Sequence, residues 1–175
     1  MQHGRWCNMT AAIKGTGDSD LAGLSVEGFT TEQTLQVVRT EYTGSSTTTT
    51  VLPRDNTIPQ NTEGGEFMTV TITPKSATST LEIKCLATAL HTAQCWIGIA
   101  LFQDSTADAL TGSPVFLSVA NGGMQVKLDY RMTSGTTSAT TFKIRMGGNL
   151  AGTCTLNGAI YNGTMNSFLE VREVL

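Results

Sequence analysis

The sequence predicts an all-β protein: an antiparallel β-sandwich, of jelly-roll type, over residues 34–175, with an extended N-terminal arm over residues 1–33. Three observations support this prediction. About nine short segments of strand-type pattern follow one another at spacings of roughly 8–15 residues. No segment has the sustained apolar spacing of a helix, and Gly, Asn and Pro separate the segments. Only 14% of the residues are charged, against about 25% in an average protein, which predicts that part of the surface is covered in an oligomer.

In the first half of the domain, residues 35–42 predict a first strand whose two faces are mixed, and a Ser/Thr tract follows at 44–50. We expect this tract to be an exposed loop or an edge strand. Residues 57–84 predict a turn, a strand, a second turn and a second strand. Pro74 ends the first of these strands because proline has a fixed φ and no N–H to donate. The second strand is expected to extend to about Leu90.

The second half contains the most apolar segment of the chain. Residues 94–103, QCWIGIALFQ, are apolar on both faces, which favours a central position in the sandwich or at a subunit interface. Further strands are predicted at 114–120, 123–132, 139–146, 153–156 and 167–175. Turns are predicted between them at Asn121-Gly122, where the pair is a strong hairpin signal, at Gly147-Gly148-Asn149, and at Asn157-Gly158.

The charge pattern argues against nucleic acid as a partner. The formal net charge is −3, and the lysines and arginines form no basic run with interleaved aromatic residues. The first residues contain no apolar core long enough for a signal peptide, and no later run approaches the ~18 apolar residues of a membrane span. We therefore expect a protein that is made in the cytoplasm and does not insert into a membrane.

The four cysteines are Cys7, Cys85, Cys95 and Cys154. They show no CxxC spacing and have no histidine at ligand spacing, so a metal site is not expected. Three of them lie inside predicted strands, where a thiol behaves as a small buried apolar group. Because the expected compartment is reducing, we predict free thiols in the core in preference to disulfides.

A search for catalytic residues gives no candidate. His3 lies in the arm, and His91 stands without an HxH or HExxH partner, so we expect His91 to be a surface or core residue. The chain has no GxSxG, Walker or GxGxxG motif and no identifiable catalytic cysteine. The sequence therefore predicts a protein without enzymatic activity, cofactor or metal.

Two aromatic residues are candidates for recognition. Trp96 is flanked by Ile97 and Ile99 in an apolar strand, and is interpreted as a core residue in preference to a sugar-stacking platform. Tyr161 lies in a predicted loop between Gly158 and Gly163, where an exposed aromatic side chain suits glycan or protein recognition. No receptor-binding residue can be assigned from these patterns.

Residues 1–33 are rich in small side chains and lack sustained periodicity. Two interpretations remain open. The segment is either a flexible arm or a docking segment that becomes ordered only against sister chains or a neighbouring protein.

The segment Thr57–Lys84, TIPQNTEGGEFMTVTITPKSATSTLEIK, resembles one that recurs in tail fibres and related receptor-binding appendage proteins of tailed bacteriophages. In those proteins a TIPQ-type turn, an acidic Gly-rich stretch and an ITP-containing strand pair open a small all-β head. Weaker similarity lies at Phe102-Gln103-Asp104 and Thr141-Phe142-Lys143. The segments Leu21–Ser25 and Leu35–Val38 are similar to the segment that joins the shaft to the head in those phage fibres.

This resemblance implies a structural virion protein, a homotrimeric fibre head that mediates attachment to a glycan or protein on the host surface. Residues 1–33 would then contact other tail or capsid proteins. The chain lacks a long shaft, which leaves a second interpretation: a capsid decoration, head-fibre or tail assembly protein with a mechanical role. A carbohydrate-active enzyme is a poor third possibility because no acid/base pair of carboxylates can be named.

Overall fold

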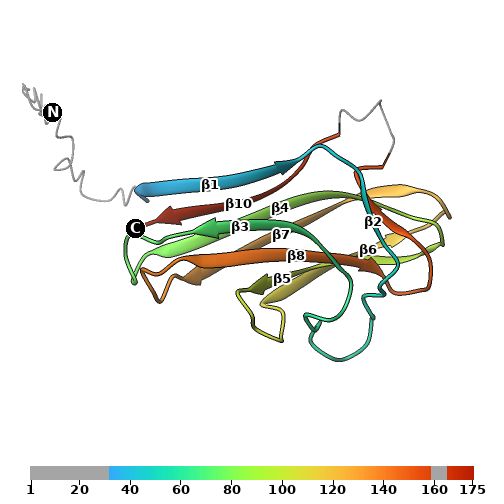
Figure 1. The fold of residues 1–175 in the computed structure, drawn as a ribbon, viewed down its shortest axis with the longest axis horizontal. Coiled ribbons are helices and arrows are strands. Elements are labelled where there is room, and N and C mark those ends of the chain that lie inside the picture. Colours follow the sequence, from blue (N-terminus) through green and yellow to red (C-terminus); the bar gives the residue numbers. More distant parts are fainter. Residues whose placement is uncertain (1–31, 159–164) are drawn as a thin grey trace, which may run out of the picture. The chain divides into compact units, whose positions relative to one another are not determined.

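A computed structural model of the chain describes residues 32–158 and 165–175, and these residues form ten β-strands (Figure 1). The strands are β1 (Thr34–Tyr42), β2 (Ser46–Thr48), β3 (Gly65–Ile72), β4 (Thr80–His91), β5 (Cys95–Gln103), β6 (Thr111–Leu117), β7 (Gly123–Thr133), β8 (Thr140–Gly148), β9 (Cys154–Leu156) and β10 (Ser167–Val174). The predicted arm lies outside the described residues except for Glu32 and Gln33, so its role stays a prediction. Tyr161 also lies outside them.

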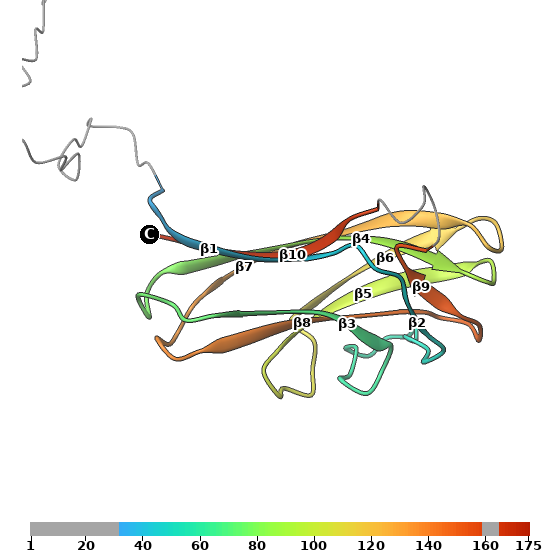
Figure 2. The same ribbon diagram turned by 45° about the horizontal axis from the view of Figure 1, so that its top comes forward.

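The strands form two antiparallel sheets packed face to face, as the two layers in Figure 2 show. One sheet has the order β1-β10-β4-β7, and the short strands β9 and β2 extend it beside the end of β4. The other sheet has the order β3-β8-β5-β6. Successive long strands such as β3 and β4, β4 and β5, and β6 and β7 belong to different sheets, so the chain repeatedly crosses between the layers. This double-sheet arrangement is a jelly roll, which confirms the predicted fold class.

Inward-facing side chains of both sheets make the core. Along β4 these are Leu81, Ile83 and Cys85, whose alternation with Glu82 and Lys84 in the sequence predicts this burial. The same core includes inward-facing residues of the other strands, among them Met68, Val70, Ile97, Ile99, Leu101, Val126, Leu128, Phe142, Ile144, Leu169 and Val171. Burial of these alternating apolar side chains is the main stabilising contribution to the sandwich.

The strand that is apolar on both faces, β5, lies between β8 and β6. Its inward residues join the core, while Ala100 and Phe102 on its outward face form a second small cluster with Leu52. Leu52 comes from the long connection between β2 and β3, so the chain covers the outer face of β5 with its own loop.

The prediction of a hairpin at Asn121-Gly122 is wrong. Asn121-Gly122 forms a turn, with Asn121 at φ +57°, but the flanking strands β6 and β7 belong to different sheets and make no hairpin. The turn is held instead against the end of β4, where Asn121 N donates to His91 O over 2.9 Å. In addition, β6 begins at Thr111 and ends at Leu117, earlier than the predicted 114–120.

Gly147 and Gly148 were expected to end a strand, but β8 continues through both. A Cβ at Gly147 would lie 2.9 Å from both the Leu52 nitrogen and the Thr50 oxygen, and one at Gly148 would lie 2.5 Å from Nε2 of His91. These glycines therefore permit close approach of a loop and of a buried side chain within a strand.

The three cysteines in the described residues are free and buried, as predicted. Burial raises the pKa of the Cys85 thiol to about 12. Burial, with a smaller contribution from nearby Cys95, also raises the pKa of Cys154 to about 12. Burial raises the pKa of Cys95 as well.

These thiols should be unreactive in the folded protein, because the thiolate is the nucleophile and burial suppresses it. In a Cys7→Ser variant, we expect no rapid reaction with a disulfide reagent such as DTNB at neutral pH. All three remaining thiols should react once the protein is unfolded in urea. Stoichiometric labelling at the rate of a model thiol, without unfolding, would contradict this prediction.

Candidate functional site

The outer face of the β3-β8-β5-β6 sheet carries a loop that we call the strap, residues 49–64. Leu52 in the strap is buried against Ala100 and Phe102 of β5. Its N–H donates to Gly148 O over 3.0 Å, and the N–H of Gly64 donates to Val51 O over 2.9 Å. The apolar packing and the Leu52–Gly148 hydrogen bond therefore anchor the strap to the sheet, and the Gly64–Val51 hydrogen bond joins the two ends of the strap.

A second loop, residues 104–110, completes the frame of this face. Asn61 N donates to Ala107 O over 2.8 Å, and Ala109 N donates to Pro59 O over 2.9 Å. Gln60 Nε2 also donates to the Asp108 carboxylate over 2.8 Å. The TIPQ turn thus joins the two loops, and its residues form part of the rim of the outer face.

A hollow of about 270 Å³ lies between the strap, β5 and β6; we call it the Trp96 hollow. Its lining residues are Leu52, Pro53, Arg54, Asp55, Thr57, Pro59, Trp96, Gly98, Ile99, Gly112, Ser113, Pro114 and Asn149. The indole of Trp96 is half-buried on the outward face of β5. The Arg54 guanidinium carbon lies 4.3 Å from its ring centroid, and the Phe116 ring packs against it at 5.3 Å with a tilt of 53°.

The polar groups of this hollow are positioned by the backbone. Asn149 is fixed by two hydrogen bonds to Trp96, because its N–H donates to Trp96 O and its Oδ1 accepts from Trp96 N, both over 2.9 Å. Asp55 Oδ1 accepts from the Thr57 hydroxyl over 2.5 Å and from the Thr57 N–H over 2.8 Å. These bonds hold the pKa of Asp55 below its ordinary value, with the hydroxyl making the largest contribution. Asp55 is therefore ionised at neutral pH.

Arg54 differs from the other cations of this face. Within residues 32–158 and 165–175, no carboxylate pairs with Arg54 and no acceptor takes a hydrogen bond from it. Its contact is with the face of Trp96, so the N–H groups at the edge of the guanidinium are available to an acceptor.

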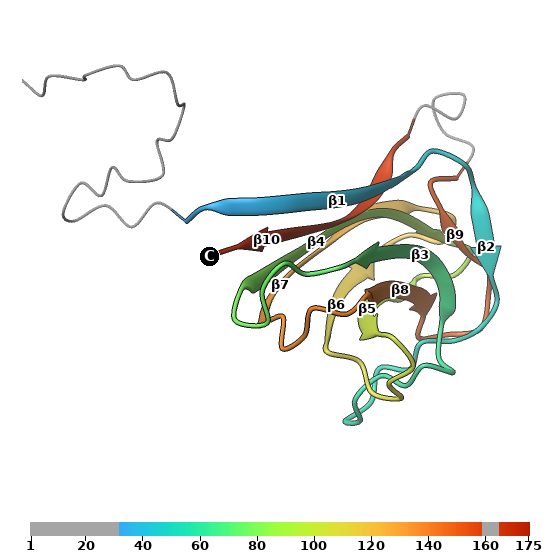
Figure 3. The same cartoon turned by 60° about the vertical axis from the view of Figure 1, so that its left-hand side comes forward.

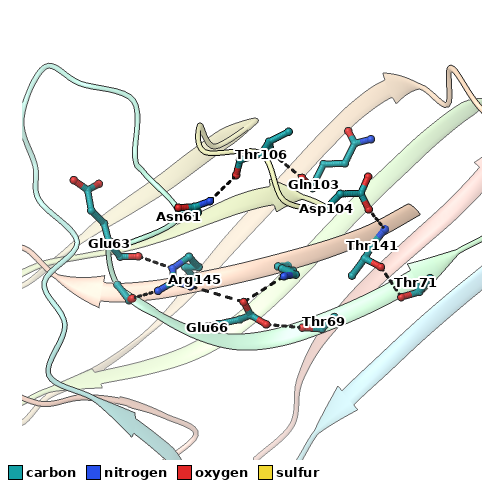
Figure 4. A network of polar contacts seen from close by, with 12 residues as sticks. Asn61, Glu63, Glu66, Thr69, Thr71, Gln103, Asp104, Thr106, Thr141 and Arg145 are labelled. Atoms are coloured by element: carbon teal, nitrogen blue, oxygen red, sulfur yellow. Dashed lines mark hydrogen bonds and ion pairs between the residues drawn. The ribbon is translucent and has the colours of Figure 1, made fainter. Parts of the chain in front are cut away.

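A second hollow, of about 330 Å³, lies over β3 and β8 beside the other loop, and we call it the Glu66 hollow. Figure 4 shows its polar network, in which Glu66 faces Arg145. The Glu66 Oε2 atom lies 3.7 Å from Lys143 Nζ and 3.8 Å from Arg145 Nη1. Arg145 also donates to the carbonyls of Glu63 over 2.7 Å and Gly64 over 2.6 Å. These groups satisfy one another, and the hydrogen bonds from Arg145 hold the end of the strap against β8.

The structure places the sequence-based candidates differently from the prediction in one case. Trp96 was expected in the core, but it lies outside the core cluster and lines the hollow. His91 is buried, and its Nδ1 accepts from Ala93 N over 3.0 Å, which confirms it as a core residue. His3 lies outside the described residues. Arg54 and Asn149 were not identified from the sequence, because Arg54 lies in a predicted turn and Asn149 in a predicted break, far along the chain from Trp96.

In the described part of the chain, no group of three or more His, Cys, Asp or Glu side chains could hold a metal ion. The same residues contain no helix of the length and apolarity that a membrane span requires.

Comparisons with known proteins identify no family. No family model matches the chain, and no curated protein matches it. Among solved structures, the Eiger TNF from S. frugiperda is similar with 8% identity and a TM-score of 0.47 over 79% of this chain and 93% of that one. The sugar-binding EclA C-terminal domain matches with 13% identity and a TM-score of 0.33, over 84% and 87%. A chain of infectious bursal disease virus, Gx strain, matches with 12% identity and a TM-score of 0.30, over 81% of this chain and 35% of that one. These values carry no argument about ligand or partner.

Proposed function

We propose that this protein is a non-enzymatic structural component of a tailed-phage virion, the homotrimeric head of a fibre-like appendage that attaches to the host surface. The observation that carries the proposal is the position of the segment Thr57–Lys84, which resembles phage fibre heads. Its first residues form the end of the strap and frame an outward face with a hollow. Residues framed by loops on a rigid sandwich are suited to recognition.

An uncharged free edge supports contact between copies of the chain. Residues 109–126 contain no Asp, Glu, Lys or Arg, and they include β6, the edge strand of its sheet. Val119 is 63% exposed and Met124 is 41% exposed on either side of the turn that follows β6. Monomeric proteins protect free strand edges with charged residues or proline. On β6, Pro114 is the one residue of this kind. Burial of this edge against a second copy would satisfy its backbone and cover its apolar side chains.

The opposite sheet has the charged surface that this edge lacks. On its outer face Glu82 pairs with Arg131 at 3.4 Å and Arg172 at 3.7 Å, and Arg39 pairs with Glu170 at 3.2 Å. Charge is therefore unevenly distributed over the sandwich, which favours the β6 edge over this face as the contact between copies. Three copies of the strap face would make attachment multivalent, so that weak single contacts give useful avidity.

Light scattering behind a sizing column tests the trimer, with the full chain and a version that begins at Glu32. Glu32 is kept because its carboxylate pairs with Arg131 at 2.7 Å. We expect a trimer for both, and a monomer for Val119→Asp, because a charge there would be buried without a partner. Thr137→Asp, which adds the same charge on an exposed loop, is the matched control and should stay trimeric. A monomeric parent chain would contradict the proposal.

Attachment is tested separately, by adsorption of the purified protein to a panel of bacterial cells. Saturable adsorption is expected for an attachment head. Binding to assembled capsids or tails without adsorption to cells would favour the mechanical role, that of a capsid decoration, head-fibre or tail assembly protein. Turnover of host polysaccharide would instead favour an enzyme.

A further inference from the structure

We infer that the Trp96 hollow binds an anionic sugar residue, with Arg54 receiving its negative group. This inference rests on the proposed attachment function and names the class of ligand that the strap face would recognise. The cation, the aromatic wall, the polar groups and the size of the hollow all favour such a ligand.

The cation is the most specific feature. Of the three cations that line the two hollows, Lys143 and Arg145 are paired with Glu66. Arg54 has no such partner among the described residues, and its guanidinium is held over the Trp96 ring at 4.3 Å. This contact with the ring uses none of the N–H donors of the guanidinium, so they remain available to a planar acceptor. A carboxylate or phosphate can take two of these donors at once.

The walls and polar groups fit a sugar. A sugar ring presents C–H groups on its faces and hydroxyls at its edge, and the hollow offers apolar surface from Trp96, Pro53 and Pro114. The Asn149 side chain is oriented by its bonds to Trp96, which leave its amide N–H groups for a hydroxyl. The second carboxylate oxygen of Asp55 can accept from another hydroxyl.

The charge arrangement also sets the direction of the ligand. Asp55 is ionised and lies beside Arg54 in the chain, so the negative group of the ligand is drawn to Arg54 and repelled from the Asp55 side. The volume of about 270 Å³ lies just below the roughly 300 Å³ at which pockets for drug-sized ligands begin. One sugar residue, at the end or side of a glycan, is therefore the unit that is recognised.

The test follows Trp96 directly. The chain has two tryptophans, Trp6 and Trp96, so a Trp6→Phe variant leaves Trp96 as the single indole reporter. Its fluorescence and its indole N–H resonance are followed during titration with glucuronate, glucose 6-phosphate and neutral glucose. We expect saturable shifts with an anionic sugar, and binding at least roughly tenfold weaker for glucose. The anionic sugar that binds more tightly identifies carboxylate or phosphate as the recognised group.

Two variants isolate the charge. Arg54→Gln should remove the preference for the anionic sugar. The Arg54 side chain is exposed, so its replacement leaves the core intact. Asn149→Asp keeps the oxygen that accepts from Trp96 N but places a negative charge in the hollow, so it should also abolish anionic binding. Lys84→Gln removes an equal charge from the opposite sheet and should bind as the parent does. Unchanged glucuronate and phosphate-sugar binding in Arg54→Gln, equal binding of glucose, or no saturable shift would overturn the inference.

Adsorption to cells separates this inference from the proposed function. If Arg54→Gln adsorbs to cells as the parent does, the attachment function stands and the Trp96 hollow is not its site. If sugar binding depends on Arg54 but the parent never adsorbs to cells, the hollow is a sugar site and the attachment function fails.

Discussion

Replacement of Glu173 by glutamine is expected to destabilise the sandwich by about 3 kcal/mol at neutral pH. Glu173 is fully buried at the end of β10. Its carboxylate accepts from Ser79 Oγ over 2.6 Å, from Gln36 Nε2 over 2.6 Å, and from the N–H groups of Lys75 and Ser76 over 2.8 and 3.1 Å. A glutamine amide would turn an NH₂ group toward some of these donors and leave them unsatisfied.

The pH dependence has a definite sign. Burial alone would raise the pKa of Glu173, but the hydrogen bonds from Ser79, Gln36, Lys75 and Ser76 outweigh it and lower the pKa from 4.5 to about 2. The ionised form is therefore favoured by folding. Its stabilisation is fully present above the unfolded pKa of 4.5 and is lost as the pH falls from there toward the folded pKa.

Urea unfolding over a series of pH values measures this effect. The parent chain should lose stability as pH falls through this window, and Glu173→Gln should show a shallower decline from a lower starting value. Glu41→Gln is the matched control, since Glu41 is exposed and its ion pair with Arg39 contributes little. Parallel pH profiles for the parent and Glu173→Gln would show that Glu173 does not act in this way.

Gly147→Ala should destabilise the protein by about 1–3 kcal/mol and weaken ligand binding at the Trp96 hollow. The added Cβ would lie 2.9 Å from the Leu52 nitrogen and the Thr50 oxygen. Both are backbone atoms, so the strap must shift and its hydrogen bond from Leu52 N to Gly148 O must weaken.

Thermal unfolding and sugar titration check this prediction together. Gly44→Ala is the control, because a Cβ there meets no atom within 4 Å, and it should change stability by less than about 0.5 kcal/mol. A stable Gly147→Ala variant with unchanged binding would mean that the strap does not set the shape of the hollow.

Much of the fold could be predicted because it is encoded in local alternation. Leu81, Ile83 and Cys85 alternate with charged residues, and the structure buries them as expected. Strand pairing could not be predicted in the same way. Asn121-Gly122 specifies the local turn, but the partner of each flanking strand is chosen by packing across the whole sandwich.

The candidate site was less predictable, for two physical reasons. The sequence predicts a core position for Trp96 because Ile97 and Ile99 follow it in an apolar strand, yet adjacent residues of a strand point to opposite faces. A buried Ile97 therefore carries no information on the burial of Trp96. The contact of Trp96 with Arg54 joins β5 to the strap, and such long-range contacts leave no periodic signal in the sequence.

The pairing of β1 with β10 has a consequence for synthesis of the protein. β10 lies between β1 and β4, and Figure 3 shows the start of β1 beside the end of β10. Leu175 N donates to Gln33 O over 3.0 Å at this point. While the ribosome makes the domain, β1 has no hydrogen-bonded neighbour, because its partner β10 is the last strand of the domain to emerge. Closing this sheet joins residues from opposite ends of the domain, which makes folding slow relative to a chain of local hairpins. The nascent domain is therefore incomplete, with two unpaired strand edges, until its final strand leaves the exit tunnel.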